Sequence, residues 1–292
     1  MTAAWVAAMR GLGAFLPASA HLVDDPFGLR FAGSLRAIRE RPRLARASSR
    51  LWLRGGLQRF VVYMQLRTRV IDDDVSNFSR AGGRQLVLLG AGFDCRAWRL
   101  DALGPATVFE VDHPATQEKK RAIMAGEQTT AAQVTFVPWD FDDEPLDRLP
   151  SRLGLDGHDP RALTMTVLEG VLMYLTEEIA AETFDCVARY SAPGSPIAFT
   201  YFDRALVEGQ SRDVVRLRRM LRVLGEPFRF GIDPAALPAW LDRRGFRLER
   251  DESASDLANR LGNPGAVDVL YGVRPGQRRF ALARRASSRS PQ

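Results

Sequence analysis

Short apolar runs alternate with amphipathic stretches along the chain from about residue 85 onward. An apolar run bounded by Gly, Pro or Asp is typical of a buried strand, whereas apolar positions that recur once per helical turn are typical of a helix. The pattern predicts seven strands, at residues 85–89, 106–111, 133–138, 162–168, 195–201, 246–250 and 278–283. It predicts five helices between them, at residues 95–103, 114–125, 146–153, 176–190 and 234–244. Such alternation indicates an α/β fold with a doubly wound parallel sheet and helices on both faces.

Three segments stand outside this alternation. Residues 1–80 are mostly helical in pattern, with breaks at Pro17, Pro26 and Pro42. Ligands of such sheets bind at the carboxyl ends of the strands. We therefore predict a helical cap over a ligand cleft, with residues 1–80 as an N-terminal cap segment and 81–292 as the sheet domain. Two further parts of the cap are expected as insertions in that domain, at about 204–231 and 253–276.

The first predicted strand runs into a glycine turn, and the second strand ends in Asp112. Gly90 and Gly92 let backbone amides approach a ligand closely, and Asp112, about 20 residues on, is placed to accept hydrogen bonds from a ribose. The turn lacks a third glycine in dinucleotide spacing, and no Lys followed by Ser or Thr comes after it. The turn therefore lacks the residues that usually bind a pyrophosphate or a triphosphate, and such ligands are disfavoured. S-adenosylmethionine, which has a ribose and no phosphate, fits better.

The ends of two later strands carry further polar candidates. Asp140 and Phe141 follow the third strand, where an Asp side chain can accept from the exocyclic amine of a base and a backbone amide can serve a ring nitrogen. An ordinary strand terminus in an acidic loop explains these two residues equally well. Glu169 follows the apolar run of the fourth strand, where a carboxylate is costly unless it meets a partner or a ligand. It can hold a cationic amino group.

Other candidates lie on the expected helices and loops. Tyr174 follows Glu169 closely enough to line the methyl-accepting side of a pocket. His113 lies between Asp112 and Pro114, where a structural role at a helix start is favoured over that of a general base. Arg67 can bind a carboxylate through its bidentate guanidinium, although it is one Arg among many.

Three consecutive carboxylates, Asp72, Asp73 and Asp74, resemble a cation site at first sight. They lack a regular ligand spacing, so helix capping and charge balance are favoured and no metal site is predicted. The chain also has no GxSxG, HExxH or CxxC motif, which disfavours serine-hydrolase, zincin and thioredoxin-type chemistry.

Composition changes this interpretation little. The 292 residues are 46% hydrophobic, enough for a sizeable core, and no apolar run is long enough to predict a membrane span. The net charge of +6 comes with only two lysines, Lys119 and Lys120, and a basic region extends from Arg36 to Arg59 with few aromatic residues. A solvated helical face is favoured there over a nucleic-acid groove, and a mild positive field that attracts an anionic small substrate is a third interpretation. Two cysteines suit a reducing cytoplasm.

Taken together, the motifs resemble those of the leucine carboxyl methyltransferase family and its bacterial relatives. The shared elements appear in the family's order: DDPFG at 24–28, LRTRVIDD at 66–73, LGAGFDCRAWRL at 89–100, FEVDHP at 109–114, PWDF at 138–141 and LEGVLMYL at 168–175. The resemblance implies a Rossmann-like class I methyltransferase sheet and S-adenosylmethionine as cofactor. Cys95 departs from the Thr usual in the glycine motif. The resemblance assigns Arg67 to the cofactor carboxylate, Gly90 to its amino acid portion, Asp112 to the ribose, Asp140 and Phe141 to the adenine, and Glu169 to the amino group.

These observations predict an S-adenosylmethionine-dependent O-methyltransferase of the cytoplasm that acts on a carboxylate or hydroxyl of a small, polyketide-like natural product. A carboxylate is ionised at neutral pH, whereas a phenol usually needs a base such as His113, so the scarcity of bases favours a carboxylate or an acidified phenol. Carboxyl methylation of a protein C-terminus is the alternative within the family. Nucleic-acid methylation, for which no NPPY-type or PCQ-type motif is present, and cofactor binding without catalysis are the alternatives from other classes.

Overall fold

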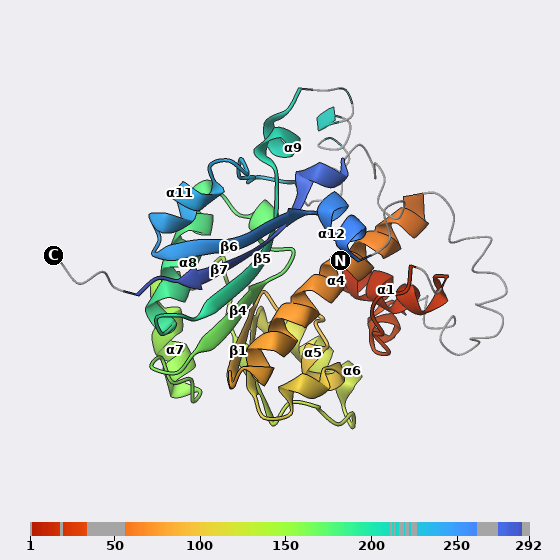
Figure 1. Cartoon of the computed structure of the whole chain (residues 1–292). Coiled ribbons are helices and arrows are strands. Elements are labelled where there is room, and N and C mark those ends of the chain that lie inside the picture. The colour runs from red at the N-terminus through yellow and green to blue at the C-terminus, as the bar shows by residue number, and fades with distance from the viewer. Residues whose placement is uncertain are drawn as a thin grey trace.

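Seven strands form one sheet in the order β3-β2-β1-β4-β5-β7-β6 (Figure 1). The computed structural model describes residues 2–17, 20–33, 56–210, 227–261 and 274–287, with a few single residues between 212 and 222. The strands are β1 (Gln85–Leu89), β2 (Thr107–Asp112), β3 (Gln133–Pro138), β4 (Thr164–Leu168), β5 (Pro196–Phe202), β6 (Phe246–Ser253) and β7 (Arg278–Arg285). All seven predicted strands are confirmed, with ends that shift by three residues or fewer.

The predicted doubly wound sheet is confirmed, but one of its strands is antiparallel. β1 to β5 pair in parallel, whereas β7 lies between β5 and β6 and runs antiparallel to both. The sequence does not indicate the direction of this strand, because a strand covered on both faces is mainly apolar in either direction. Parallel pairing nevertheless brings the carboxyl ends of β1, β2 and β4 to one edge.

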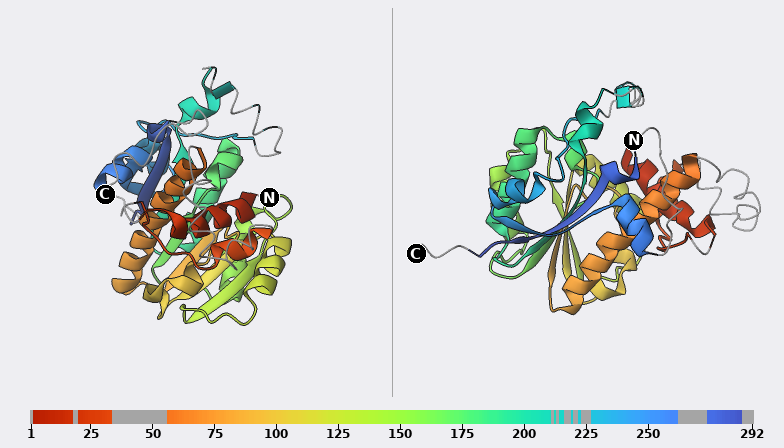
Figure 2. Two further views of the ribbon diagram at one scale, coloured as in Figure 1. Left: turned by 90° about the vertical axis from the view of Figure 1, so that its right-hand side faces the viewer. Right: turned by 45° about the horizontal axis from the view of Figure 1, so that its top comes forward.

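Helices cover both faces of the sheet (Figures 1 and 2). One face carries α4 (Gly56–Arg80), α5 (Arg96–Arg99), α6 (Pro114–Met124) and α12 (Ala254–Arg260). The other carries α7 (Leu149–Leu155), α8 (Glu177–Tyr190) and α11 (Leu237–Asp242). The short helical turns are η4 (Asp101–Leu103), η5 (Leu146–Arg148), η6 (Leu172–Tyr174) and η7 (Pro275–Gln277).

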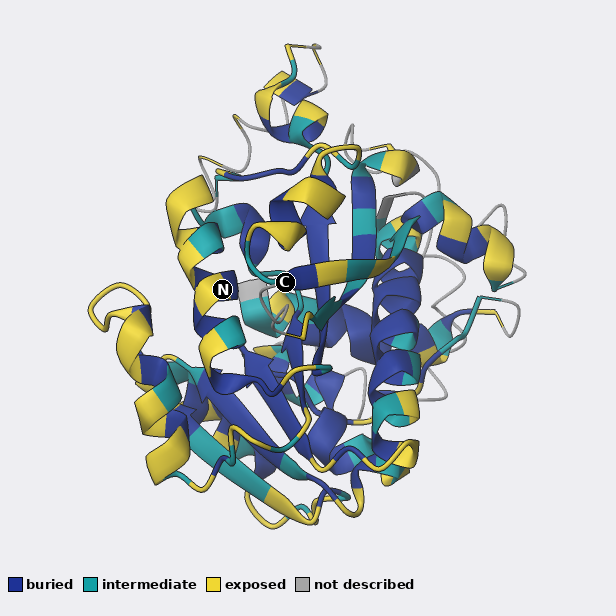
Figure 3. Ribbon diagram, turned by 60° about the vertical axis from the view of Figure 1, so that its left-hand side comes forward, coloured by how far each residue is buried: buried dark blue, intermediate teal, exposed yellow. Residues whose placement is uncertain are grey.

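Two apolar cores result, one on each face of the sheet. Along β1, Leu86 and Leu88 belong to the core under α4, whereas Val87 and Leu89 belong to the core under α8. Successive side chains of a strand point to opposite faces, so a strand buried on both sides must be apolar throughout. Figure 3 shows the buried central strands in dark blue, with more exposed residues on the edge strands.

The described parts of residues 1–80 are mostly helical, as predicted. They contain α1 (Thr2–Gly11), η1 (Leu12–Phe15) and η2 (Gly28–Phe31) before the long helix α4, against which α1 packs (Figure 2). Pro42 and most of the basic region between Arg36 and Arg59 lie outside the described residues. None of the described helices has a stretch apolar and long enough to cross a bilayer.

Only parts of the two predicted cap insertions are described. The first contains α9 (Arg204–Glu208) and residues 227–231, and the second contains α12 and η7. Ser253 begins α12 with a capping box, in which its side chain accepts from Asp256 N while the Asp256 side chain accepts from Ser253 N. The division into a cap segment and a sheet domain stays a prediction.

Candidate active site

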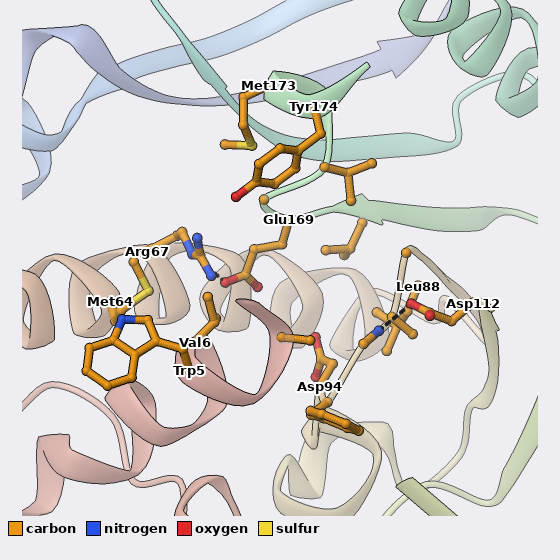
Figure 4. A pocket seen from close by; sticks show the side chains of 18 of the residues that line it. Trp5, Val6, Met64, Arg67, Leu88, Asp94, Asp112, Glu169, Met173 and Tyr174 are labelled. Atoms are coloured by element: carbon orange, nitrogen blue, oxygen red, sulfur yellow. Dashed lines mark hydrogen bonds and ion pairs between the residues drawn. The ribbon is translucent and has the colours of Figure 1, made fainter. Parts of the chain in front are cut away.

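A cavity of about 400 Å³ opens at the carboxyl ends of β1, β2 and β4 (Figure 4). Its floor is the glycine turn after β1 together with Asp112 and Glu169, and helices α1 and α4 line it from the side. This is the edge at which ligands bind in open α/β sheets. Six of the nine predicted site residues line the cavity: Arg67, Gly90, Gly92, Asp112, Glu169 and Tyr174.

The glycine turn is held against the end of β2. Gly90 and Gly92 have φ angles of +73° and +50°, in the left-handed region that favours glycine. Gly90 N donates to Val111 O at 2.9 Å, and Gly92 N donates to Asp112 Oδ2 at 2.6 Å. A Cβ on Gly90 would lie 2.7 Å from Val171 Cγ2. Both glycines are therefore required by the backbone path that brings the turn to Asp112.

Arg67 and Glu169 form a buried ion pair beside this turn. Arg67 lies on α4, and Glu169 comes just after β4. Arg67 Nε donates to Glu169 Oε1 at 2.6 Å, and Arg96 Nη2 lies 2.8 Å from Glu169 Oε2. Both side chains of the first pair are less than one-tenth exposed. Burial opposes ionisation, but Arg96 and Arg67 outweigh it and hold the pKa of Glu169 well below its usual range. Glu169 is thus a permanent anion in contact with two cations.

The sequence interpretation missed Arg96, which is 1% exposed and joins three carboxylates. Arg96 Nε donates to Asp72 Oδ1 at 2.7 Å, and the same guanidinium pairs with Asp94 and Glu169. A charge buried this deeply is stable only when it is paired. The available signal was the pair of arginines, Arg96 and Arg99, in the short segment that follows the glycine turn.

The three consecutive aspartates balance charge, as predicted. Asp72 pairs with Arg96 and also with Arg99, while Asp73 pairs with Arg69 at 2.9 Å and Asp74 pairs with Arg250 at 2.5 Å. Within the described residues, no group of three His, Cys, Asp or Glu side chains is arranged to hold a metal ion.

Helix α1 contributes residues that sequence patterns did not single out. Arg10 Nε donates to Asp25 Oδ2 at 2.9 Å, and Arg10 Nη2 donates to Phe93 O, in the glycine turn, at 2.5 Å. This buried guanidinium fixes α1 to the turn. As a result Trp5 and Val6 reach the cavity (Figure 4).

The three remaining predicted residues are grouped together, but the cavity lining described here does not include them. His113 Nε2 lies 3.2 Å from Asp140 Oδ2, and Asp140 Oδ1 accepts from Asp142 N at 3.0 Å. His113 Nδ1 accepts from Ala115 N at 3.1 Å, which confirms its structural role at the start of α6. Phe141 is exposed. The adenine contacts of Asp140 and Phe141, and the role of His113 as a base, stay predictions.

The side of the cavity next to η6 is apolar. Met173 is buried with Phe202 and Leu206, and it also lines the cavity. Tyr174 lines the cavity with its ring centroid 6.0 Å from that of Phe228. In Figure 4 the Tyr174 hydroxyl points toward the Arg67–Glu169 pair.

The residues present fit S-adenosylmethionine. An adjacent cation and anion, Arg67 and Glu169, complement the carboxylate and ammonium of an amino acid. Asp112 lines the cavity and offers a carboxylate to a ribose diol. The left-handed glycines keep side chains out of the space between these groups.

Comparisons with known proteins agree with this fit. The model of the leucine carboxyl methyltransferase family matches residues 3–188. A protein of Mycolicibacterium smegmatis, named as a candidate S-adenosyl-L-methionine-dependent methyltransferase, is 35% identical over 219 residues, which cover 70% of this chain and 66% of that protein. A protein of the same name from Mycobacteroides abscessus is 32% identical over 230 residues, which cover 75% of this chain and 73% of that protein.

Solved structures confirm the fold. A protein of the DUF574 family from Streptomyces avermitilis has a TM-score of 0.58 at 15% identity, over 96% of each chain. A candidate methyltransferase from Thermobifida fusca has a TM-score of 0.52 at 17% identity, over 87% of this chain and 89% of its own.

The match to the family model extends over more than half of the chain, from α1 to α8. It includes the glycine turn, Asp112 and Glu169, and the names of the relatives confirm the expected cofactor, S-adenosylmethionine. The chain therefore belongs to the leucine carboxyl methyltransferase family of S-adenosylmethionine-dependent methyltransferases.

Proposed function

We propose that the chain is an O-methyltransferase that methylates a carboxylate or hydroxyl of a small, polyketide-like natural product. The observation that carries the proposal is the Arg67–Glu169 pair, which lies in one cavity with Asp112 and with apolar residues such as Met173. The charged residues suit the methyl donor, and the apolar residues leave a place for an acceptor. We place the reaction in the cytoplasm, where buried thiols such as Cys95 and Cys186 stay reduced.

When bound, S-adenosylmethionine supplies a methyl group whose bond to the sulfonium sulfur breaks, with the electron pair left on sulfur, while the acceptor oxygen donates a pair to form the new bond. The protein contributes placement, because Arg67, Glu169 and Asp112 are fixed by ion pairs and backbone contacts before any ligand arrives.

The described lining favours an acceptor oxygen that is already ionised or readily ionised. It contains no histidine, and its three carboxylates, Asp94, Asp112 and Glu169, are each held by a cation or a backbone amide. A carboxylate acceptor has no proton to lose. A hydroxyl acceptor releases its proton to water at the cavity mouth, which is easiest for an acidified phenol.

Carboxyl methylation of a protein C-terminus is the second candidate, and the family that the chain matches supports it. Either acceptor would use the same donor side of the cavity. The two differ in the size of the molecule that must reach the reacting oxygen.

Mass spectrometry can test the proposal. The protein is incubated with S-adenosylmethionine that carries a deuterated methyl group and with matched small carboxylic acids and phenols, with a peptide ending in a free leucine as the protein-type acceptor. The proposal expects the label in a small-molecule ester or ether, which mild base distinguishes because it cleaves esters only. Label found only in the peptide, or in no acceptor although the cofactor binds, would contradict it.

A further inference from the structure

Charged residues and aromatic residues both line the cavity. Among the charged residues, Arg67, Asp112 and Glu169 lie near the glycine turn and would contact the proposed cofactor. Aromatic rings and methionines from four separate segments of the chain also line the cavity: Trp5, Phe60, Met64, Met173, Tyr174 and Phe228.

One aromatic wall is preformed beside η6. The ring of Phe228 is near those of Tyr174 and Phe202, at centroid distances of 6.0 and 4.7 Å. Arg229 N donates to Met173 O at 2.8 Å, so the segment that carries Phe228 is tied by its backbone to η6. Tilted rings at these distances attract one another, and the wall keeps its shape without a ligand.

The facing wall comes from α1 and α4. In Figure 4, Trp5, Val6 and Met64 lie on one side of the Arg67–Glu169 pair, and Met173 and Tyr174 lie on the other. Trp5 lines the cavity yet is 48% exposed, so a large apolar ring remains in water. An acceptor that covered this ring would gain the free energy of its burial.

Each ionised side chain in the described lining already has a partner. Arg10 donates to Asp25 and Arg67 donates to Glu169, while Asp94 pairs with Arg96. Asp112 accepts from two backbone amides. A charge on the body of an acceptor would therefore be desolvated against rings and methionines without compensation.

We infer that the acceptor is a planar aromatic molecule whose only ionisable group is the oxygen that is methylated, and that its ring system lies between Trp5 and Tyr174. The inference rests on the proposed methyl transfer and narrows its substrate class. It leaves the acceptor no charge other than that of the methylated oxygen. Aromatic rings on both walls match the flat shape of such a molecule and bind it by stacking.

Calorimetry on the intact protein loaded with S-adenosylhomocysteine tests this inference without turnover. The probes are phenol and 2-naphthol, each beside its saturated counterpart, cyclohexanol and decahydro-2-naphthol, with 6-hydroxynaphthalene-2-sulfonate as the charged analogue. We expect 2-naphthol to bind about tenfold or more tightly than its saturated and sulfonated analogues. The inference would be overturned if 2-naphthol bound no more tightly than decahydro-2-naphthol, or no more tightly than the sulfonate. It would also be overturned if neither aromatic alcohol bound.

Variants locate the site. Trp5→Leu should weaken 2-naphthol binding about three- to tenfold, whereas Trp5→Phe should keep most of the affinity. Leu163→Ala removes another exposed apolar side chain, away from the cavity lining, and should change nothing. Unchanged binding in Trp5→Leu would contradict the assignment. If S-adenosylhomocysteine itself does not bind, the proposed function is overturned. If it binds but aromatic and saturated probes bind equally well, only this inference is overturned.

Discussion

Arg67 Nε lies 2.6 Å from Glu169 Oε1, although the two residues are 102 positions apart in the chain. α4 supplies the cation and the end of β4 supplies the anion. The pair therefore presents opposite charges side by side at the edge of the sheet where the glycine turn begins. A zwitterionic amino acid can bind both charges at once, which a lone Arg or Glu does not offer.

Replacement of Glu169 by Gln should reduce both binding and stability. The change leaves Arg67 and Arg96 without their shared carboxylate, and removal of one partner of a buried ion pair costs about 3–5 kcal/mol. We expect S-adenosylhomocysteine to bind at least about tenfold more weakly by calorimetry, and urea unfolding to show the loss of stability. Glu178→Gln, on the surface of α8, is the control. Wild-type affinity in Glu169→Gln would remove this residue from the site.

Gly90 and Gly126 allow a matched comparison of backbone strain and close approach. Both have positive φ angles, +73° and +84°. A Cβ at Gly90 would lie 2.7 Å from Val171 Cγ2, whereas a Cβ at Gly126 would meet nothing within 4 Å. Gly126→Ala should therefore cost only the strain of its φ, about 1–2 kcal/mol, and leave cofactor binding intact. Gly90→Ala should cost more in thermal unfolding and also weaken binding, and equal effects in the two variants would contradict this account of the turn.

Acid should destabilise the fold partly through His158. This side chain is buried between Phe109 and Tyr190, and burial lowers its pKa to about 4. The unfolded chain takes up this proton near pH 6.5 and the folded chain only near pH 4, so stability is lost as the pH falls through that window. The effect should amount to roughly 1–3 kcal/mol.

Urea unfolding at pH 7 and pH 4.5 measures the effect. His158→Phe should lose less stability between the two pH values than the wild-type chain, because Phe cannot take up a proton. His21→Gln serves as the control, since His21 lies in a partly exposed pair with Asp24. An identical pH dependence in the wild type and His158→Phe would show that His158 contributes nothing to the acid response.

The strands could be predicted closely because a covered strand is a short apolar run with clear ends. β1 and β3 begin and end at the predicted residues, and β6 extends three residues beyond its prediction to Ser253. The direction of β7 could not be predicted, since parallel and antiparallel strands that are buried on both faces have the same composition. The partly described insertion near α9 carried no motif that sequence could place.

The local pattern predicted the site best where residues follow a strand, whereas Arg67, on α4, was assigned to the site by the family resemblance. Asp112 ends β2 and Glu169 directly follows β4, and parallel pairing brings such strand ends together. Arg10 and Arg96 were missed because the contacts that bring them to the site join distant parts of the chain. Arg10 donates to Phe93 O, 83 positions away, and Arg96 pairs with Glu169, which follows β4. Tertiary packing of α1 also brought Trp5 to the cavity, and no local pattern indicates that contact.

The most direct test of the methyl-donor site is a calorimetric titration of S-adenosylhomocysteine into the wild-type chain and into Asp112→Ala. Asp112 lines the cavity and holds Gly92 N at 2.6 Å, so its loss removes the ribose acceptor and loosens the turn together. We predict saturable one-to-one binding to the wild type and an affinity about 100-fold weaker in Asp112→Ala. The control is Asp185→Ala, at an exposed position of α8, and its affinity should be unchanged. No binding to the folded wild-type chain, or equal affinity in Asp112→Ala, would contradict the account.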